Sequence, residues 1–232
     1  LQLTPDSPEA LDALPSLEIQ DVPKEIEKYP LEIKNQGDSK ILFHDLFTND
    51  IAYIQIGFNT HSVPDEMIPY ISLLGTLVLG MGTGRHSYTE ISKLIGMHTG
   101  GIRTSHFSSA TVQDRHQVLS YIFFSGKALL EKVDSLFDIF DELLGDYSFD
   151  DHKRLVEIIR SAKSDMEDSI VPHGNHYVLS RLQSYQSRLG QFDELTDGIT
   201  YYRFLEQLLE RVEKDPGEVA DRFRQVAERV FT

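Results

Sequence analysis

The stretch LVLGMGTGRHSYTE, residues 77–90, decides how the middle of this 232-residue chain folds. An apolar run ends among three closely spaced glycines, and Ser87 and Glu90 then open another periodic segment. Glycine is the usual residue at a helix C-terminus, and Ser87 with Glu90 has the spacing of a capping box. The stretch therefore predicts one helix that ends at the glycines, a turn, and a second helix capped by Ser87.

The glycines do not have the spacing of a nucleotide-binding loop. A dinucleotide loop carries Gly-x-Gly-x-x-Gly after a strand, and here the third glycine position holds Arg85. A P-loop needs a Lys after its last glycine, and none follows. The Gly-x-Ser-x-Gly elbow and the His-Glu-x-x-His and His-x-x-Glu-His zinc motifs are also missing from the sequence. No motif of the chain assembles a catalytic site.

Composition narrows the classes of partner. The chain has 37 acidic and 22 basic residues, a net charge of −15, and no cysteine. Such a charge opposes nucleic-acid binding and attracts basic peptides, although it also serves plain solubility. Without cysteine there is no disulfide framework and no thiolate metal site. No signal peptide is visible, and the start at Leu1 leads us to expect a segment of a longer protein.

On the N-terminal side, five prolines within residues 1–38 exclude a long helix and predict an extended arm or linker. Residues 40–59 (KILFHDLFTNDIAYIQIGFN) predict two strands about a Thr-Asn-Asp turn. Residues 65–82 (DEMIPYISLLGTLVLGMG) are apolar nearly all round. That run is too short and too interrupted for a membrane span, so we expect a buried core helix and no membrane contact.

On the C-terminal side, the sequence predicts two antiparallel strands at residues 101–112 and 116–126. After Gly126 the apolar residues recur at helical spacings. The predicted helices are 127–146, 150–170, 173–189, 202–214 and 217–231. The order predicts an α+β fold with an antiparallel sheet and helices packed on one face. We expect an arm at 1–38 and one domain at 39–232.

The histidines offer one candidate metal site, at His173 and His176. A catalytic zinc site has three protein ligands, and the nearest acidic residues lie at 165–168, beyond Pro172. Pro172 breaks the helix, so the spacing does not bring these groups to one helix face. We therefore expect no metal ion in this chain.

Three strings carry a resemblance to a known family: LLGTLVLGMGT at 73–83, SYTEISKLIGMHTGGIRTS at 87–105, and HQVLSYIFFSGKALLEKVDSLFDIFDELL at 116–144. Their order resembles the repeated domain of insulinase-like (pitrilysin-type) zinc metallopeptidases. With LPSLEIQDVP at 14–23, the chain is similar to the associated, third domain of the presequence-protease branch. The resemblance covers most of residues 15–190. It implies the LuxS and processing-peptidase type of metallohydrolase fold, preceded by a linker arm.

The same resemblance implies that this domain has no catalytic centre. In the family, a catalytic domain carries His-x-x-Glu-His before a Gly-Thr turn, and later domains keep the fold without the ligands. Placing Gly82 and Thr83 on that turn sets Leu73 and Leu77 at the ligand positions and Thr76 at the acid position. None of these can bind zinc or move a proton. The zinc would therefore belong to a catalytic domain elsewhere in the parent protein.

The family's architecture implies a role in a peptide-degrading chamber built from two bowl-shaped halves. This chain would form part of the second half, with other domains of the same polypeptide and peptide substrates as its partners, basic peptides among them. In the catalytic copy a peptide adds to the strand after Gly-Gly, which here sets Gly101, Ile102, Arg103 and Thr104 as substrate contacts. The alternative for that strand is an ordinary sheet edge.

A second function stays open, from a different class. The chain could be a stand-alone, catalytically inactive interaction module that resembles a non-catalytic processing-peptidase subunit. An upstream His-x-x-Glu-His on the same polypeptide would separate the two. The resemblance implies the cytoplasm for a bacterial protein and an organelle matrix for a eukaryotic one.

Overall fold

The computed structural model describes residues 5–15 and 17–231, and the chain divides into two units, one up to Thr48 and one from Asn49 onward. The smaller unit contains short helices α1 (Pro8–Asp12) and η1 (Ile19–Asp21), and a hairpin of β1 (Glu32–Gln36) and β2 (Ser39–Phe43). Its described side chains are exposed. This unit therefore has no hydrophobic core of its own.

The strand at β2 does not pair with the strand that follows the Thr-Asn-Asp turn. It pairs with β1, where Gln36 lies opposite Ser39 and Gly37 takes a φ of 59°. A two-residue hairpin turn with a glycine in the left-handed region is a standard connection. Asn49 and Asp50 also have positive φ angles, so the expected turn forms, but it leads into the sheet of the larger unit.

The larger unit is built on a three-stranded antiparallel sheet in the order β3-β5-β4. Its strands are β3 (Ile51–Asn59), β4 (Ile102–Ala110) and β5 (Val118–Leu129). Its helices are η2 (Asp65–Met67), α2 (Ile68–Met81), α3 (Tyr88–His98), η3 (Leu130–Lys132), α4 (Val133–Gly145), α5 (His152–Ile170), α6 (Gly174–Ser184), α7 (Arg188–Thr196), α8 (Ile199–Lys214) and α9 (Pro216–Phe231). The prediction of an α+β chain with antiparallel strands is confirmed.

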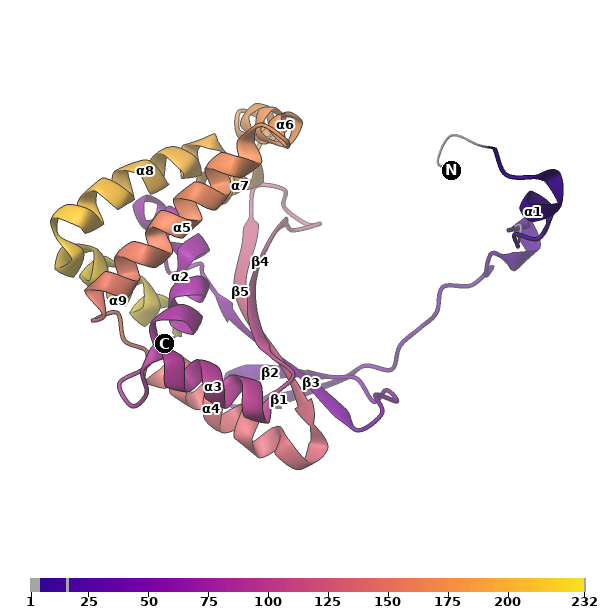
Figure 1. Ribbon diagram of the computed structural model, residues 1–232, viewed down its shortest axis with the longest axis horizontal. Coiled ribbons are helices and arrows are strands. Elements are labelled where there is room, and N and C mark those ends of the chain that lie inside the picture. The colour runs from indigo at the N-terminus through magenta and orange to yellow at the C-terminus, as the bar shows by residue number, and fades with distance from the viewer. Residues whose placement is uncertain (1–4, 16, 232) are drawn as a thin grey trace. The chain divides into compact units, whose positions relative to one another are not determined.

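The helices of this unit lie on one side of the sheet (Figure 1). Ile122 and Phe124 of β5 are fully buried on that side. A side chain at Gly126 would collide with Leu136 and Phe140 of α4, each within 3.0 Å of an added Cβ. Alternation along β5 thus sends one set of residues into the core and the other set to the opposite face.

Two helix boundaries differ from the prediction. Residues 127–129 continue β5, because the alternation of buried and exposed positions extends past Gly126 to Leu129. The single helix expected at 173–189 is two helices, α6 and α7, and the second of these extends to Thr196. Ser187 begins α7 by accepting a hydrogen bond from the backbone N–H of Gly190 at 2.9 Å, which is the geometry of an N-cap.

Helix α2 is the core helix that the sequence predicts. Tyr70, Leu74, Leu77 and Val78 are buried, and the exposed fraction of the last three is zero. Among the helices in the described part of the chain, none combines the length and the apolarity that crossing a bilayer requires. The apolar character of α2 therefore comes from contact with protein on nearly every side.

Replacing Leu77 with Ala should lower the free energy of unfolding by about 2–5 kcal/mol, the usual cost of truncating a core leucine. Chemical denaturation followed by circular dichroism measures this. The control is Thr76→Ala on the same turn, where the side chain is exposed and the change should stay within about 0.5 kcal/mol. Equal effects of the two substitutions would show that Leu77 is not a core residue.

Candidate functional site

The three positions of the degenerate zinc motif lie on α2 but do not share one environment. Leu73 and Leu77 are buried, with exposed fractions of 3% and 0%. Thr76 is exposed. Aliphatic side chains carry no lone pair for a metal ion, and zinc sites use nitrogen, sulfur or oxygen ligands. The residues at the two ligand positions therefore do not fit a zinc ion.

The two leucines point away from the sheet, which differs from the expectation that they would face it. An added Cβ at Gly75 would lie 2.8 Å from Cβ of Thr104 in β4, so Gly75 marks the sheet side of α2. An added Cβ at Gly80 would lie 3.0 Å from Cδ1 of Ile158 in α5. At about 100° per residue, Leu73 and Leu77 lie within about 60° of Gly80 and nearly opposite Gly75. Both leucines belong to the packing between α2 and the helical layer.

The glycine turn after α2 is a braced loop. Gly82 ends the helix with a φ of 98°, and Ser87 forms the predicted capping box with Glu90. Glu142 of α4 accepts hydrogen bonds from Thr83 Oγ1 and from His86 Nδ1, the latter at 2.7 Å. The predicted helix cap and turn are thus confirmed, and the loop's polar groups are bound to α4.

The Glu142 carboxylate is held ionised by this brace. Its side chain is 8% exposed, and burial by itself raises the pKa of a carboxyl group. The hydrogen bonds from Thr83 and His86 outweigh burial, so the pKa of Glu142 lies below its ordinary value of 4.5. A carboxylate with both partners in place serves to hold the loop, and no open position for a substrate adjoins it.

The four candidate substrate contacts on β4 are divided between the two faces of the sheet. Gly101, with a φ of 105°, precedes the strand. Ile102 and Thr104 point toward the helices, since Ile102 packs against the core and Thr104 contacts α2 at Gly75. Arg103 lies on the opposite face and is exposed. Because β4 is an edge of the sheet, its outer side has no partner strand within the described residues.

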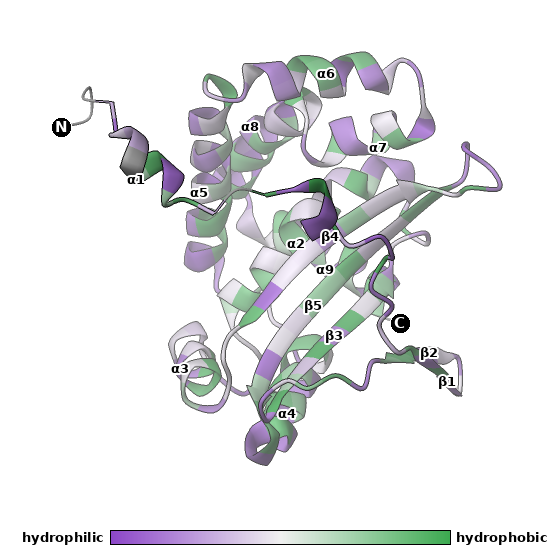
Figure 2. Cartoon of the chain, turned by 90° about the vertical axis from the view of Figure 1, so that its right-hand side faces the viewer, coloured by the Kyte–Doolittle hydropathy of each residue, from purple (hydrophilic) through white to green (hydrophobic). Residues whose placement is uncertain are grey.

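We call the side of the sheet that carries no helices the free face; it consists of the odd-numbered positions of β3, β4 and β5. Figure 2 looks onto this face, with the helices behind it. Its charged residues are Arg103 and Lys127, and none of its positions holds Asp or Glu. Its aromatic residues are Tyr53, Phe107, Tyr121 and Phe123. The alternation in β3 was visible in the sequence, but the joint face required the register of all three strands.

The centre of the free face is flat and aromatic. The rings of Tyr121 and Phe123 stack with their centroids 5.8 Å apart. Phe123 lies across Gly57 of β3, so closely that a Cβ at Gly57 would collide with the ring. Exposed aromatic surface of this kind marks a place where an apolar group can bind.

The two histidines weighed as a metal site do not come together. His173 Nδ1 lies 3.2 Å from the backbone oxygen of Ser169, whereas His176 Nε2 lies 3.3 Å from Oδ2 of Asp197. Across residues 5–15 and 17–231, no cluster of three or more His, Asp and Glu side chains could hold a metal ion. This finding covers only the described part of the chain.

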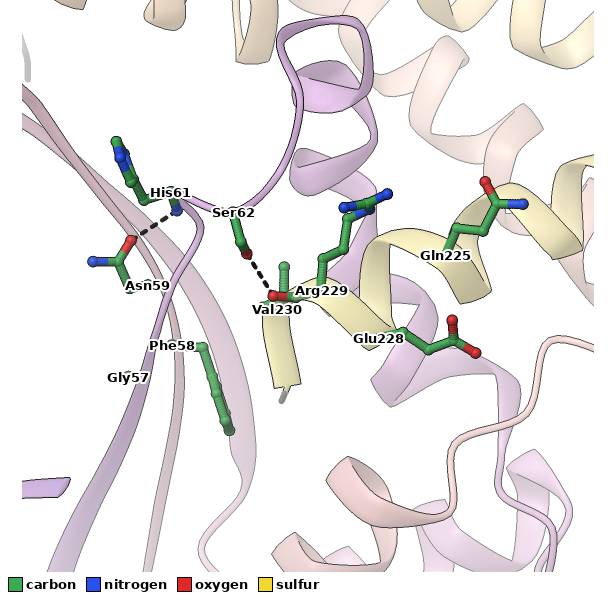
Figure 3. A pocket seen from close by; sticks show the side chains of 9 residues that line it. All are labelled: Gly57, Phe58, Asn59, His61, Ser62, Gln225, Glu228, Arg229 and Val230. Atoms are coloured by element: carbon green, nitrogen blue, oxygen red, sulfur yellow. Dashed lines mark hydrogen bonds between the residues drawn. The ribbon is translucent and has the colours of Figure 1, made fainter. Parts of the chain in front are cut away.

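A pocket of about 820 Å³ lies between the end of β3 and α9 (Figure 3). Ser62 Oγ donates a hydrogen bond to the backbone oxygen of Arg229 at 2.6 Å, and the N–H of His61 donates to Asn59 Oδ1 at 2.7 Å. The side chains of Gln225 and Arg229 point in different directions in Figure 3. Because they do not converge, the pocket offers no defined binding geometry.

Replacing Glu142 with Gln should lower the free energy of unfolding at pH 7 by about 1.5–3 kcal/mol, the usual worth of hydrogen bonds to a charged group. A lowered folded-state pKa gives stability that is complete above about 4.5 and is lost as the pH falls further. The difference between the wild-type protein and the variant should therefore shrink in acid. Urea titrations at several pH values measure it, with exposed Glu131→Gln as the control. A difference that is constant with pH would contradict the prediction.

Comparison with known proteins identifies the relatives of this chain. A family model that describes the associated domain of peptidases of family sixteen, subfamily C, matches residues 1–208. Protein HypA of Clostridium perfringens is 32% identical over 230 residues, which are 99% of this chain and 23% of that protein. Presequence protease 1, chloroplastic/mitochondrial, of Arabidopsis thaliana is 33% identical over 214 residues, covering 92% of this chain and 20% of that protein.

The mitochondrial presequence protease of Saccharomyces cerevisiae is 29% identical over 233 residues, covering 97% of this chain and 23% of that protein. The chain thus spans between 20% and 23% of the length of these three curated relatives.

Proposed function

Because the chain belongs to this peptidase-associated family, we propose that it is a non-catalytic segment of a zinc metalloendopeptidase. In this proposal it forms part of the second half of a closed peptide-degrading chamber. Residues 1–38 are the end of the linker between the halves, and residues 39–232 have the LuxS and processing-peptidase type of fold. Two of the relatives named above are presequence proteases, and most of their length lies outside the matched region.

The observation that carries the proposal is the environment of Leu73 and Leu77. A zinc-binding helix would present two histidines to an open site, whereas these two side chains are sealed between α2 and the helical layer. Thr76, at the position of the catalytic acid, has no acidic proton to transfer near neutral pH. The catalytic zinc of the parent protein would therefore be held by another domain, and no chemical step passes through this one.

The free face supports a role in contacting peptides. Its aromatic side chains offer apolar contact, and the exposed edge at Gly101–Thr104 allows an extended peptide to add to the sheet. The net charge of −15 favours basic peptides through long-range attraction. Peptides with both basic and apolar side chains satisfy both conditions. We place the parent protein in an organelle matrix if its source is eukaryotic, and in the cytoplasm if it is bacterial.

The isolated 232-residue chain should bind no stoichiometric zinc and cleave no peptide, because the ligand positions hold leucine. Metal analysis by mass spectrometry and a fluorogenic peptide assay measure the two properties. In the longer polypeptide, Thr76→Val should leave kcat unchanged, whereas loss of a true general acid lowers rates by about 10²–10⁴. Zinc bound tightly to the isolated chain, or a collapse of kcat in the Thr76 variant, would contradict the proposal.

Replacing Phe107 with Ser in the longer polypeptide should raise KM for an apolar, basic peptide about fivefold and leave kcat unchanged. The expected loss is about 1 kcal/mol of apolar contact. Phe137→Ser on α4 is a matched control, since the two rings are 49% and 50% exposed. Steady-state kinetics with each variant measure the effect. If both variants behave alike, the free face does not contact substrate.

A further inference from the structure

Helix α6 turns its apolar side outward. Val178 and Leu182 are 62% and 54% exposed, whereas Ser180 and Ser184 are buried. A surface helix normally buries its apolar stripe and exposes its polar one. The inverted pattern leaves a row of aliphatic side chains without a partner in the described part of the chain.

These aliphatic side chains form one wall of a groove between α6 and α8. The groove has a volume of about 440 Å³. Ile170 at the end of α5 and Ile199 at the start of α8 contribute further apolar surface, and Arg181 and Arg203 also line it. We call it the α6–α8 groove. Its lining includes no Asp or Glu.

A buried carboxylate fixes the walls of the α6–α8 groove. Glu194 of α7 is 3% exposed. It accepts hydrogen bonds from Ser180 Oγ at 3.1 Å and from Arg181 Nη1 at 3.3 Å in α6. It also accepts bonds from the backbone N–H and the hydroxyl of Thr200, at 3.0 and 2.9 Å. The distance between α6 and α8 is therefore set before any partner arrives, which lowers the entropic cost of binding.

The charges around the groove select the occupant. The Arg203 side chain makes no hydrogen bond or ion pair with another residue of the described chain. An unpaired arginine beside exposed aliphatic side chains, in a chain with net charge −15, leaves a local positive site open to a carboxylate. Gly174, Val178, Arg181 and Leu182 recur at helical spacing along about 12 Å of α6. A helix laid alongside presents side chains at the same intervals.

From these observations we propose that the α6–α8 groove is a docking site for an acidic amphipathic helix of a partner protein. The helix inserts aliphatic side chains between Val178, Leu182 and Ile199, and a Glu or Asp at its edge pairs with Arg203. This inference rests on the groove alone and is independent of the proposed role in a peptidase.

Two synthetic helical peptides of equal length test the proposal, each with leucines along one stripe. One carries glutamates beside the stripe and the other lysines. Fluorescence anisotropy with the 232-residue chain measures binding. The net charge of the chain by itself favours the lysine peptide, so a preference of about tenfold or more for the glutamate peptide can arise only from a local cationic site.

Variants locate that site. Arg203→Glu should abolish the preference for the glutamate peptide, whereas Arg188→Glu should preserve it, because Arg188 is exposed on α7 outside the groove. Leu182→Ser should weaken binding of the glutamate peptide at least about tenfold, and Leu130→Ser should not. These two leucines are 54% and 58% exposed. Circular dichroism spectra and melting curves confirm that every variant is folded.

Three outcomes would overturn the proposal. The first is equal or tighter binding of the lysine peptide. The second is self-association of the chain that Arg203→Glu abolishes, with no peptide bound, because the occupant would then be a second copy. The third is binding of the glutamate peptide by this chain but not by the longer polypeptide, because another part of that polypeptide would then fill the groove.

Discussion

The close contact of α2 with the sheet on one side and with α5 on the other positions the elements of the larger unit. Gly75 allows the helix backbone to approach Thr104 of β4, and Gly80 allows Ile158 of α5 to approach from the opposite side. A side chain at either glycine would need space that the neighbouring residues occupy. The apolar residues between the two glycines are buried because both approaches are short. This arrangement converts a helix suited to metal binding in the family's catalytic domain into an element of the core.

Local signals in the sequence predicted the elements around α2 well. The glycines at its end, the Ser87–Glu90 box and the alternation in β3 each depend on chemistry within a few residues, and all three are present. The pairing of β2 could not be obtained in this way. Two turns flank that strand, at Gly37 and at Asn49, and both have the positive φ angles that a tight turn requires. Nothing local states which neighbour the strand will join.

Directions in space were harder to predict than elements. Helical spacing placed Leu73 and Leu77 on one side of α2, but spacing alone cannot say whether that side meets the sheet or other helices. The free face posed the same difficulty, because it exists only once the register of three strands is known. In α6 the usual rule gives the wrong side. The buried Glu194 draws Ser180 inward by a hydrogen bond, and the aliphatic residues are left outside.

Glu194 also links the fluctuations of three helices. Its carboxylate is bonded to α6 and to the first turn of α8, and it resides on α7. Opening any one of these helices would leave a desolvated charge without donors, which is costly. The three segments therefore open and close together, as one cooperative unit in amide hydrogen exchange. The chain can then lose this corner transiently while α2 and the sheet keep their exchange protection.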